Sequence, residues 1–227
     1  MLKEIILFSP ILIVSLVALC FFWIVKLREK KHRIQKQIIK SGDRGEHKVQ
    51  SALKVLEHPN SRYKVYHNVK LGPDPVHTNE YDTLVVGPNG IFHIETKNYG
   101  GERGGIIEID SNNNWILHKK SGFSKMVPSP MGQLDSHEYR LRGFLAKYVR
   151  MKNIPTQGII VLSCDDLVLR RNTKIQLNRP VLNRHELVYY IKRYRGSNLV
   201  LYPRTIKKIC RKIEAMNKMA WAQVKAN

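Results

Sequence analysis

The stretch YDTLVVGPNGIFHIETK, residues 81–97, decides the fold of this 227-residue chain. Two runs rich in β-branched and aromatic residues flank a Gly-Pro-Asn-Gly turn at 87–90, a pattern typical of a β-hairpin. A two-residue loop places Asp82 directly opposite Glu95, and Glu95 shares its face of the strand with Lys97. The spacing therefore predicts that two carboxylates and a lysine meet at the end of an apolar hairpin.

This charged cluster has a chemical rationale, because unpaired charges on an apolar strand are costly to bury. The carboxylates of Asp82 and Glu95, with the Thr96 carbonyl and water, form the hard oxygen set that Mg²⁺ (or Mn²⁺) accepts. Lys97 would then orient or help deprotonate the attacking water, while the metal stabilises charge on a phosphodiester. Two simpler interpretations stay open: a surface salt bridge at Lys97, and a glycine bulge that shifts the register and puts Thr96 opposite Asp82.

Other hydrophobic patterns predict the elements around this hairpin. Helical spacing and capping signals predict helices over residues 43–57, 130–150, 185–194 and 205–224. Alternation and short apolar runs predict further strands over residues 63–71, 106–109, 115–118, 158–162 and 181–182. This order predicts an α/β (α+β) core with a mixed sheet flanked by helices.

The N-terminal region has the features of a membrane anchor. Residues 5–25 carry no charge, and this run at about 1.5 Å per residue matches the hydrocarbon thickness of a bilayer. A secretory signal peptide is the alternative, but no small-x-small cleavage site follows. Seven Lys and Arg residues lie between 26 and 40. They predict a single-pass protein of the cell membrane with its N-terminus outside and its C-terminal domain in the cytoplasm. They also predict contact with anionic lipid.

Charge and cysteine content narrow the partners. The formal net charge is +21 and the pI is about 10, which favours a polyanionic partner: nucleic acid, a membrane surface, or both. The three cysteines are widely separated, so they indicate neither a disulfide framework nor a zinc site. Their pattern fits a reducing compartment.

The Asp…Glu-x-Lys pattern resembles the motif of PD-(D/E)XK nucleases. More narrowly, the chain resembles the nuclease-related domain (NERD) family over about residues 41–148, and this resemblance implies a restriction-endonuclease-like core. The stretches that carry it are Gly42-Asp43-Arg44-Gly45-Glu46, Tyr66-His67-Asn68-Val69, Tyr81 to Ile91, Ile94 to Tyr99, Trp115, Pro130 and Gln133.

The resemblance implies roles for single residues. Asp82 and Glu95 match the metal ligands, and Lys97 matches the catalytic lysine. Glu46, on the first helix of the domain, matches an acidic residue that joins the metal site, although it could instead stabilise the start of that helix. Gln133 matches a glutamine that supports the site or the substrate backbone.

One turn after Gln133 stands His137, which is expected to be an ordinary exposed helical histidine. The chain is expected to comprise an anchor (1–27), a basic linker helix (28–41) ended by Ser41-Gly42, a nuclease-like domain (42–165) and a basic helical extension packed on it (166–227). The expected function is membrane-anchored, metal-dependent hydrolysis of nucleic acid, with DNA expected ahead of RNA. A nucleic-acid-binding module without catalysis and a membrane-surface scaffold are the alternatives.

Overall fold

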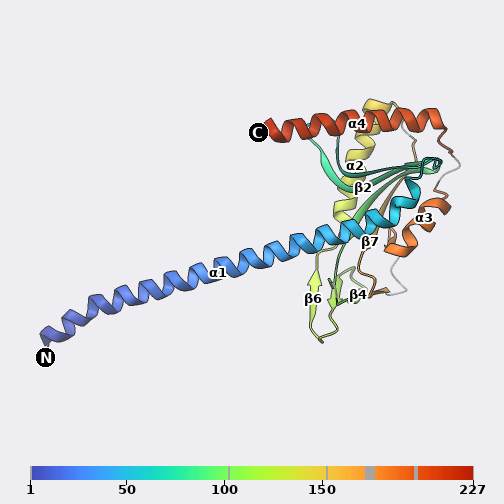
Figure 1. Cartoon of the computed structure of the whole chain (residues 1–227). Coiled ribbons are helices and arrows are strands. Elements are labelled where there is room, and N and C mark those ends of the chain that lie inside the picture. The colour runs from blue at the N-terminus through green and yellow to red at the C-terminus, as the bar shows by residue number, and fades with distance from the viewer. Residues whose placement is uncertain (1, 102, 152, 172–176, 197–198, 227) are drawn as a thin grey trace. The chain divides into compact units, whose positions relative to one another are not determined.

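The computed structural model describes residues 2–101, 103–151, 153–171, 177–196 and 199–226, and the side chains of these from residue 14 to residue 225. It divides into two compact units, residues 1–43 and 44–227. Helix α1 (Leu2–Leu53) supplies the first unit and the opening helix of the second (Figure 1).

The predicted helix break at Ser41-Gly42 is wrong, because α1 is helical through both residues. Gly42 is exposed and has nothing near it, so it costs the helix only about 1 kcal/mol relative to alanine. The predicted anchor is not confirmed: within the part of the chain whose side chains are described, no helix combines the length and apolarity needed to cross a membrane. Residues 5–13 of the predicted span lie outside that part.

A five-stranded mixed sheet forms the centre of the second unit, in the order β1-β2-β3-β7-β9. Its strands are β1 (Lys64–Leu71), β2 (Asn79–Gly87), β3 (Gly90–Lys97), β7 (Thr156–Leu162) and β9 (Val181–Asn183). The first three are antiparallel neighbours, whereas β7 and β9 run parallel to β3. The predicted mixed sheet and its strands are therefore confirmed.

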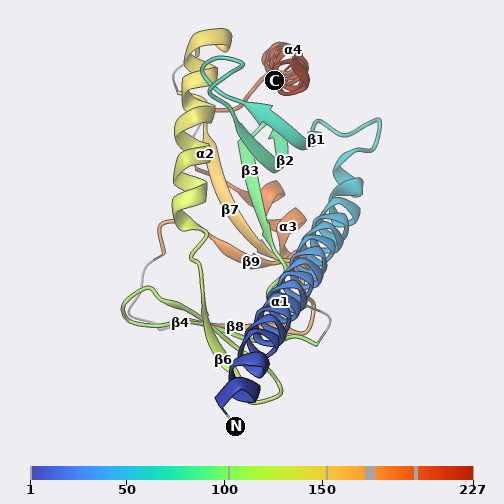
Figure 2. The ribbon, with the colours of Figure 1, turned by 90° about the vertical axis from the view of Figure 1, so that its left-hand side faces the viewer.

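Helices cover both faces of this sheet (Figures 1 and 2). On one face lie α2 (Met131–Phe144), which continues as a π-helical turn (Leu145–Val149), and α4 (Pro203–Ala226). On the other face lie the end of α1, with a 3-10 turn (Lys54–Leu56), and α3 (Leu187–Arg193), which follows a 3-10 turn (Arg184–Glu186). Each face is therefore buried against two helices, as an apolar sheet requires.

A second sheet of four strands lies in the order β6-β5-β4-β8. The hairpin of β4 (Gly105–Ile109) and β5 (Trp115–His118) is the predicted one, but β6 (Ser124–Val127) and β8 (Leu167–Arg171) were not predicted. Both are short edge strands with mostly exposed side chains, so they lack the apolar alternation that marks a strand in the sequence. Trp115 on β5 packs in the core between this sheet and β7.

The β2–β3 hairpin has the predicted register. Its paired residues run from Gly87 with Gly90 to Thr83 with Ile94, so the loop has two residues and contains no glycine bulge. The prediction is wrong one step further along: Asp82 and Glu95 form no backbone pair. Asp82 is also skipped in the ladder with β1, where its partner would be Asn68.

The irregularity at Asp82 changes the face to which both strands direct their side chains. Val65 of β1 packs on the α1–α3 side, whereas Val69, two full periods later, packs on the α2–α4 side. In β2, Val85 and Tyr81 differ in the same way. Asn68 adopts a left-handed φ of 52° at this point. Irregularities of this kind turn a side chain in a new direction, and here the residue concerned is Asp82.

Candidate functional site

Lys97 lies at the centre of the candidate site. Its Nζ donates hydrogen bonds to Glu95 Oε1 at 2.5 Å and to Gln133 Oε1 at 3.1 Å. Glu95 and Lys97 are two apart on β3 and share a face, while Gln133 comes from the first turn of α2. The structure therefore brings together three of the sequence-predicted residues through a single ammonium group.

Asp82 joins this group by a different route from the predicted one. Its Oδ2 accepts a hydrogen bond of 2.8 Å from the backbone N–H of Thr96. The Asp82 carboxylate thus accepts the hydrogen bond from Thr96 that a backbone carbonyl of β2 would accept in a regular ladder. Lys97 acts electrostatically on Asp82 by lowering its pKa, but burial is the larger effect and the net pKa is raised.

The Thr96 backbone points toward Asp82. Backbone groups alternate between the two sides of a strand, and the carbonyl of Lys97 faces β7, where it accepts a hydrogen bond from Ser163. Thr96, one residue earlier, therefore directs both its N–H and its carbonyl toward β2 and the Asp82 carboxylate. This is the orientation that the predicted backbone ligand requires.

Glu46 is positioned by the close approach of α1. Gly45 is buried, and a Cβ there would lie 2.6 Å from Ser163 Oγ and 2.9 Å from Asn98 Cβ. Only glycine permits the helix to approach the end of β3 so closely. The neighbouring Glu46 is half-buried and raises the pKa of Glu95 electrostatically. It therefore lies within the electrostatic reach of the site, which a helix-start role alone would not require.

The surroundings of Glu95 disfavour its charged form. Burial and the neighbouring Asp82 charge raise its pKa to about 7, and Lys97 only partly opposes them. The side chain is 2% exposed, and its second oxygen, Oε2, has no hydrogen-bond partner among the described residues. A buried carboxylate oxygen without a partner is uncommon, and a cation that it would bind is one explanation.

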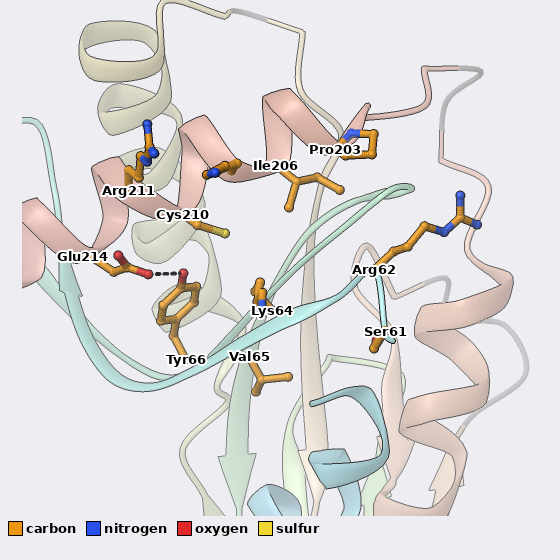
Figure 3. Close-up of a pocket in the computed structure, with 11 residues that line it drawn as sticks. Ser61, Arg62, Lys64, Val65, Tyr66, Pro203, Ile206, Cys210, Arg211 and Glu214 are labelled. Atoms are coloured by element: carbon orange, nitrogen blue, oxygen red, sulfur yellow. Dashed lines mark hydrogen bonds between the residues drawn. The ribbon is translucent and has the colours of Figure 1, made fainter. Parts of the chain in front are cut away.

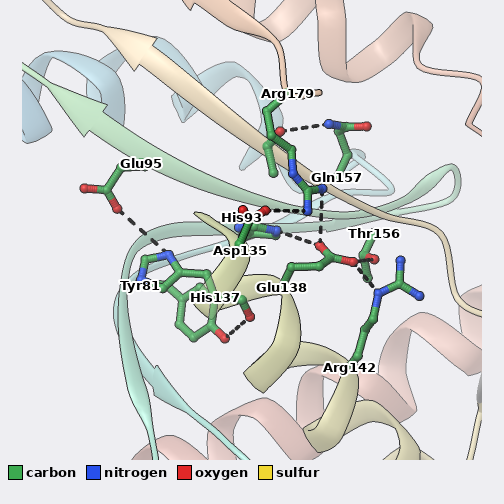
Figure 4. A network of polar contacts seen from close by, with 11 residues as sticks. Tyr81, His93, Glu95, Asp135, His137, Glu138, Arg142, Thr156, Gln157 and Arg179 are labelled. Atoms are coloured by element: carbon green, nitrogen blue, oxygen red, sulfur yellow. Dashed lines mark hydrogen bonds and ion pairs between the residues drawn. The ribbon is translucent and has the colours of Figure 1, made fainter. Parts of the chain in front are cut away.

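His137 was expected to be exposed, and this expectation is wrong. The side chain is 3% exposed, and its Nδ1 lies 3.9 Å from Glu95 Oε2 (Figure 4). Burial lowers its pKa to about 4, so the imidazole is neutral at neutral pH. The sequence did hold a signal: His137 follows Leu134 by three residues and precedes Leu141 by four, so it stands on the apolar stripe of α2.

A second polar network, around Glu138, lies next to His137 and was also missed (Figure 4). Glu138 of α2 accepts hydrogen bonds from His93 Nε2 at 2.8 Å, Thr156 Oγ1 at 2.5 Å and Arg142 Nε at 2.5 Å. Burial opposes its ionisation, but the hydrogen bonds from His93 and Thr156 prevail and lower the pKa of Glu138 to about 2. This carboxylate is therefore ionised and satisfied by protein groups.

The donor set suits a hard divalent cation. No group of three or more His, Cys, Asp or Glu side chains in the described part of the chain could hold a metal ion. Mg²⁺ does not need such a cage, because it commonly binds through one or two carboxylates and keeps its waters or substrate oxygens. The Asp82 carboxylate, Glu95 Oε2 and the Thr96 carbonyl are oxygen donors of this kind, and the unpartnered Oε2 is the observation that fits best.

Comparison with known proteins identifies a family for this chain. The sequence model of the family described as "Nuclease-related domain" matches residues 41–163, which include all of the candidate site. No curated protein and no solved structure matches the chain. Because the family match extends over more than half of the sequence, the chain belongs to the nuclease-related domain family.

Proposed function

We propose that this protein is a metal-dependent nuclease that hydrolyses phosphodiester bonds of nucleic acid, with DNA ahead of RNA. The observation that carries the proposal is the unpartnered oxygen of Glu95, buried beside Lys97 at the end of β3. In a salt bridge that served only stability, a buried carboxylate oxygen without a hydrogen-bond donor would cost free energy without any compensation. Membership of the nuclease-related domain family supports the same reaction class.

Asp82, Glu95 and the Thr96 carbonyl would hold Mg²⁺ or Mn²⁺, with Glu46 as an additional acidic contributor. The bound ion would supply charge stabilisation to the phosphodiester. Among the chain's own groups, Lys97 is held by Glu95 and Gln133 in one position. From there its ammonium group can hold a water molecule or a non-bridging phosphate oxygen, so we assign it the role of orienting the nucleophile.

Gln133 limits where Lys97 can point. Its side chain is exposed and belongs to the first turn of α2, and its oxygen is engaged by Lys97. The amide nitrogen of Gln133 is on the other side of the same group, from which it could donate to a substrate oxygen. We therefore assign Gln133 to positioning of Lys97 and of the substrate backbone.

The proposal is tested with the purified full chain and single- and double-stranded DNA and RNA in Mg²⁺, Mn²⁺ or EDTA. We expect cleavage that needs the metal and that falls by at least about a thousandfold in Lys97→Ala. The matched control is Lys70→Ala, which removes a lysine that pairs with Glu80 on the neighbouring strands. Binding of nucleic acid without any cleavage would favour the non-catalytic module instead.

We propose in addition that residues 5–25 attach the protein to the cell membrane, with the C-terminal domain in the cytoplasm. The absence of charge in this run and the seven basic residues that follow it support the proposal. After alkaline extraction of cells, we expect the full chain to remain with the membranes and a chain lacking residues 1–27 to be released. Equal release of the two proteins would rule the anchor out.

A further inference from the structure

A groove of about 630 Å³ lies between the start of β1 and the first turns of α4, apart from the candidate catalytic site (Figure 3). The helix side presents Ile206 and Cys210, and the strand side presents Tyr66. Four cationic side chains line it from both walls: Arg62, Lys64, Lys207 and Arg211. The groove therefore has an apolar floor and a basic rim.

All four cations are exposed, and none of them forms an ion pair in the described part of the chain. The groove has one carboxylate, Glu214, and this side chain accepts a hydrogen bond of 2.9 Å from the Tyr66 hydroxyl (Figure 3). The local field is consequently positive and is not neutralised within the domain.

The basic rim continues along the outer face of α4. A neighbouring hollow of about 540 Å³ is lined by Arg204, Lys207, Lys208, Arg211 and Lys212. These residues recur at spacings of three and four, so they form a ridge about 12 Å long on one side of the helix. Lys207 and Arg211 line both hollows, so the cations of α4 lie beside the groove whose other wall carries Arg62 and Lys64.

The direction of α4 relates this groove to the catalytic end of the sheet. Lys64 pairs with Val86, which pairs with Ile91 of β3, and Lys97 lies six residues further along that strand. The separation along the strand is about 20 Å. Further along the helix, Asn217 accepts a hydrogen bond from the backbone N–H of Lys70, near the end of β1. The helix therefore runs from the groove toward the level of Lys97, on the same face of the sheet.

We propose that the groove between α4 and β1 binds the phosphodiester backbone of nucleic acid as a second contact, about six base pairs from the cleavage site. The choice of polymer rests on the proposed nuclease function. The shape supports it independently of that function, because cations on two facing walls suit a chain that enters a recess. A planar layer of lipid head groups reaches only protruding side chains, such as those of a basic amphipathic surface.

The test measures binding without cleavage. The full chain is titrated in EDTA against fluorescein-labelled single- and double-stranded DNA and RNA oligonucleotides over a range of KCl concentrations. We expect Lys207→Ala/Arg211→Ala to weaken binding by at least about tenfold at low salt and to reduce the slope of log K against log salt by about 2. The matched control, Lys31→Ala/Lys54→Ala, removes the same charge outside the groove and should keep the wild-type slope.

Two outcomes would overturn the proposal. In one, the groove variant and the control variant have the same salt slope. In the other, vesicles of phosphatidylglycerol bind the wild type but not the groove variant, while all proteins bind the oligonucleotides equally. Melting temperatures of both variants should equal that of the wild type, because all four substituted side chains are exposed.

A small substrate separates this proposal from the proposed function. Bis(p-nitrophenyl) phosphate is too short to reach the groove from the catalytic site, so its cleavage by the groove variant should match that by the wild type. If the wild type cleaves neither this compound nor nucleic acid in Mg²⁺ or Mn²⁺, the proposed function fails. The salt slopes measured in EDTA still decide whether the groove binds nucleic acid.

Discussion

Two buried glutamates on the same face of the sheet have opposite environments. Glu138 is 7% exposed and receives hydrogen bonds from His93, Thr156 and Arg142, and its pKa is lowered to about 2. Glu95, two residues from His93 along β3, has one cationic partner and one unpartnered oxygen, and its pKa is raised to about 7. Both carboxylates are buried, so burial alone does not explain why their pKa values shift in opposite directions.

The number of hydrogen-bond donors around each carboxylate explains the difference between their pKa values. The Glu138 network stabilises the ionised form, as expected for a carboxylate that holds α2 to the sheet. Around Glu95 the carboxylates of Asp82 and Glu46 add negative charge, and Lys97 offsets only part of it. The protein therefore keeps one carboxylate satisfied for stability, and keeps another under electrostatic strain that a divalent cation would relieve.

The largest expected effect comes from neutralising the strained carboxylate. Glu95→Gln should reduce metal-dependent cleavage by about a thousandfold or more, because it removes a charged oxygen from the site. Its melting temperature should not fall, since the charge that is lost is a destabilising one. Activity assays and thermal unfolding in EDTA measure the two effects, and Glu80→Gln on β2 is the matched control. A large loss of stability in Glu95→Gln would contradict the contrast between the two glutamates.

Substitution of the satisfied carboxylate, Glu138, should instead lower stability. Glu138→Ala leaves His93 and Arg142 without their shared acceptor, and we expect the free energy of unfolding to fall by about 3 kcal/mol. Urea denaturation measures this change. Any folded Glu138→Ala protein should still bind Mn²⁺, because Glu138 contributes no ligand. If unfolding is unaffected, the network is not the structural element that its geometry indicates.

The pH dependence of stability should separate the same two residues. A carboxyl group whose folded pKa is raised contributes stability below its unfolded pKa, and this contribution is lost as the pH rises through about 7. In EDTA at pH 8, Glu95→Gln should therefore be more stable than the wild type by about 2 kcal/mol, and the difference should shrink toward pH 4.5.

The depressed pKa values of Glu138 and His137 act in the opposite direction. Their contributions are present at neutral pH and are lost on acidification, for His137 from about pH 6.5 down to its folded value of about 4. The wild type and Glu95→Gln both keep Glu138 and His137. These two contributions should therefore be lost equally from both proteins on acidification. A difference between wild type and Glu95→Gln that grows as the pH falls would have the wrong sign for this account.

The smallest expected effect concerns His137. In His137→Phe the ring can still pack against Tyr81, whose ring centroid lies 4.6 Å away, but the nitrogen that faces Glu95 is lost. We expect Mn²⁺ affinity to fall by about tenfold, as is typical when a group next to a metal ligand is removed. Calorimetric titration measures the affinity. His137→Asn, which restores a polar atom, should recover part of it, whereas a purely structural role predicts no such rescue.

Much of the site could be predicted from the sequence, because hairpin register follows from the turn. The Gly-Pro-Asn-Gly turn fixed the positions of Asp82, Glu95 and Lys97 on the correct strands. The contact of Asp82 with the Thr96 backbone could not be predicted, since it depends on a change of face in two strands at once. The left-handed conformation of Asn68 marks that change in the structure. An asparagine within a predicted strand is not enough to predict such a conformation from the sequence.

The missed parts share a physical cause. His137 and Glu138 are polar residues at core positions of α2, and periodicity locates a core position without naming the partner that makes it tolerable. The partners come from β3 and β7, far away in the sequence. In the same way, β6 and β8 owe their existence to pairing with β5 and β4 rather than to their own apolar content.

The missing side chain of Gly45 has a consequence for how this protein could be tuned. The distance between α1 and the end of β3 is set by an absent methyl group, since a Cβ would meet Ser163 and Asn98. Gly45→Ala would act as a wedge that lifts Glu46 away from Glu95 while every ionisable group of the site stays in the sequence. The size of the side chain at position 45 thus sets how strongly Glu46 acts on Glu95. A substitution there could change the metal affinity of the site without replacing any residue that would bind the metal.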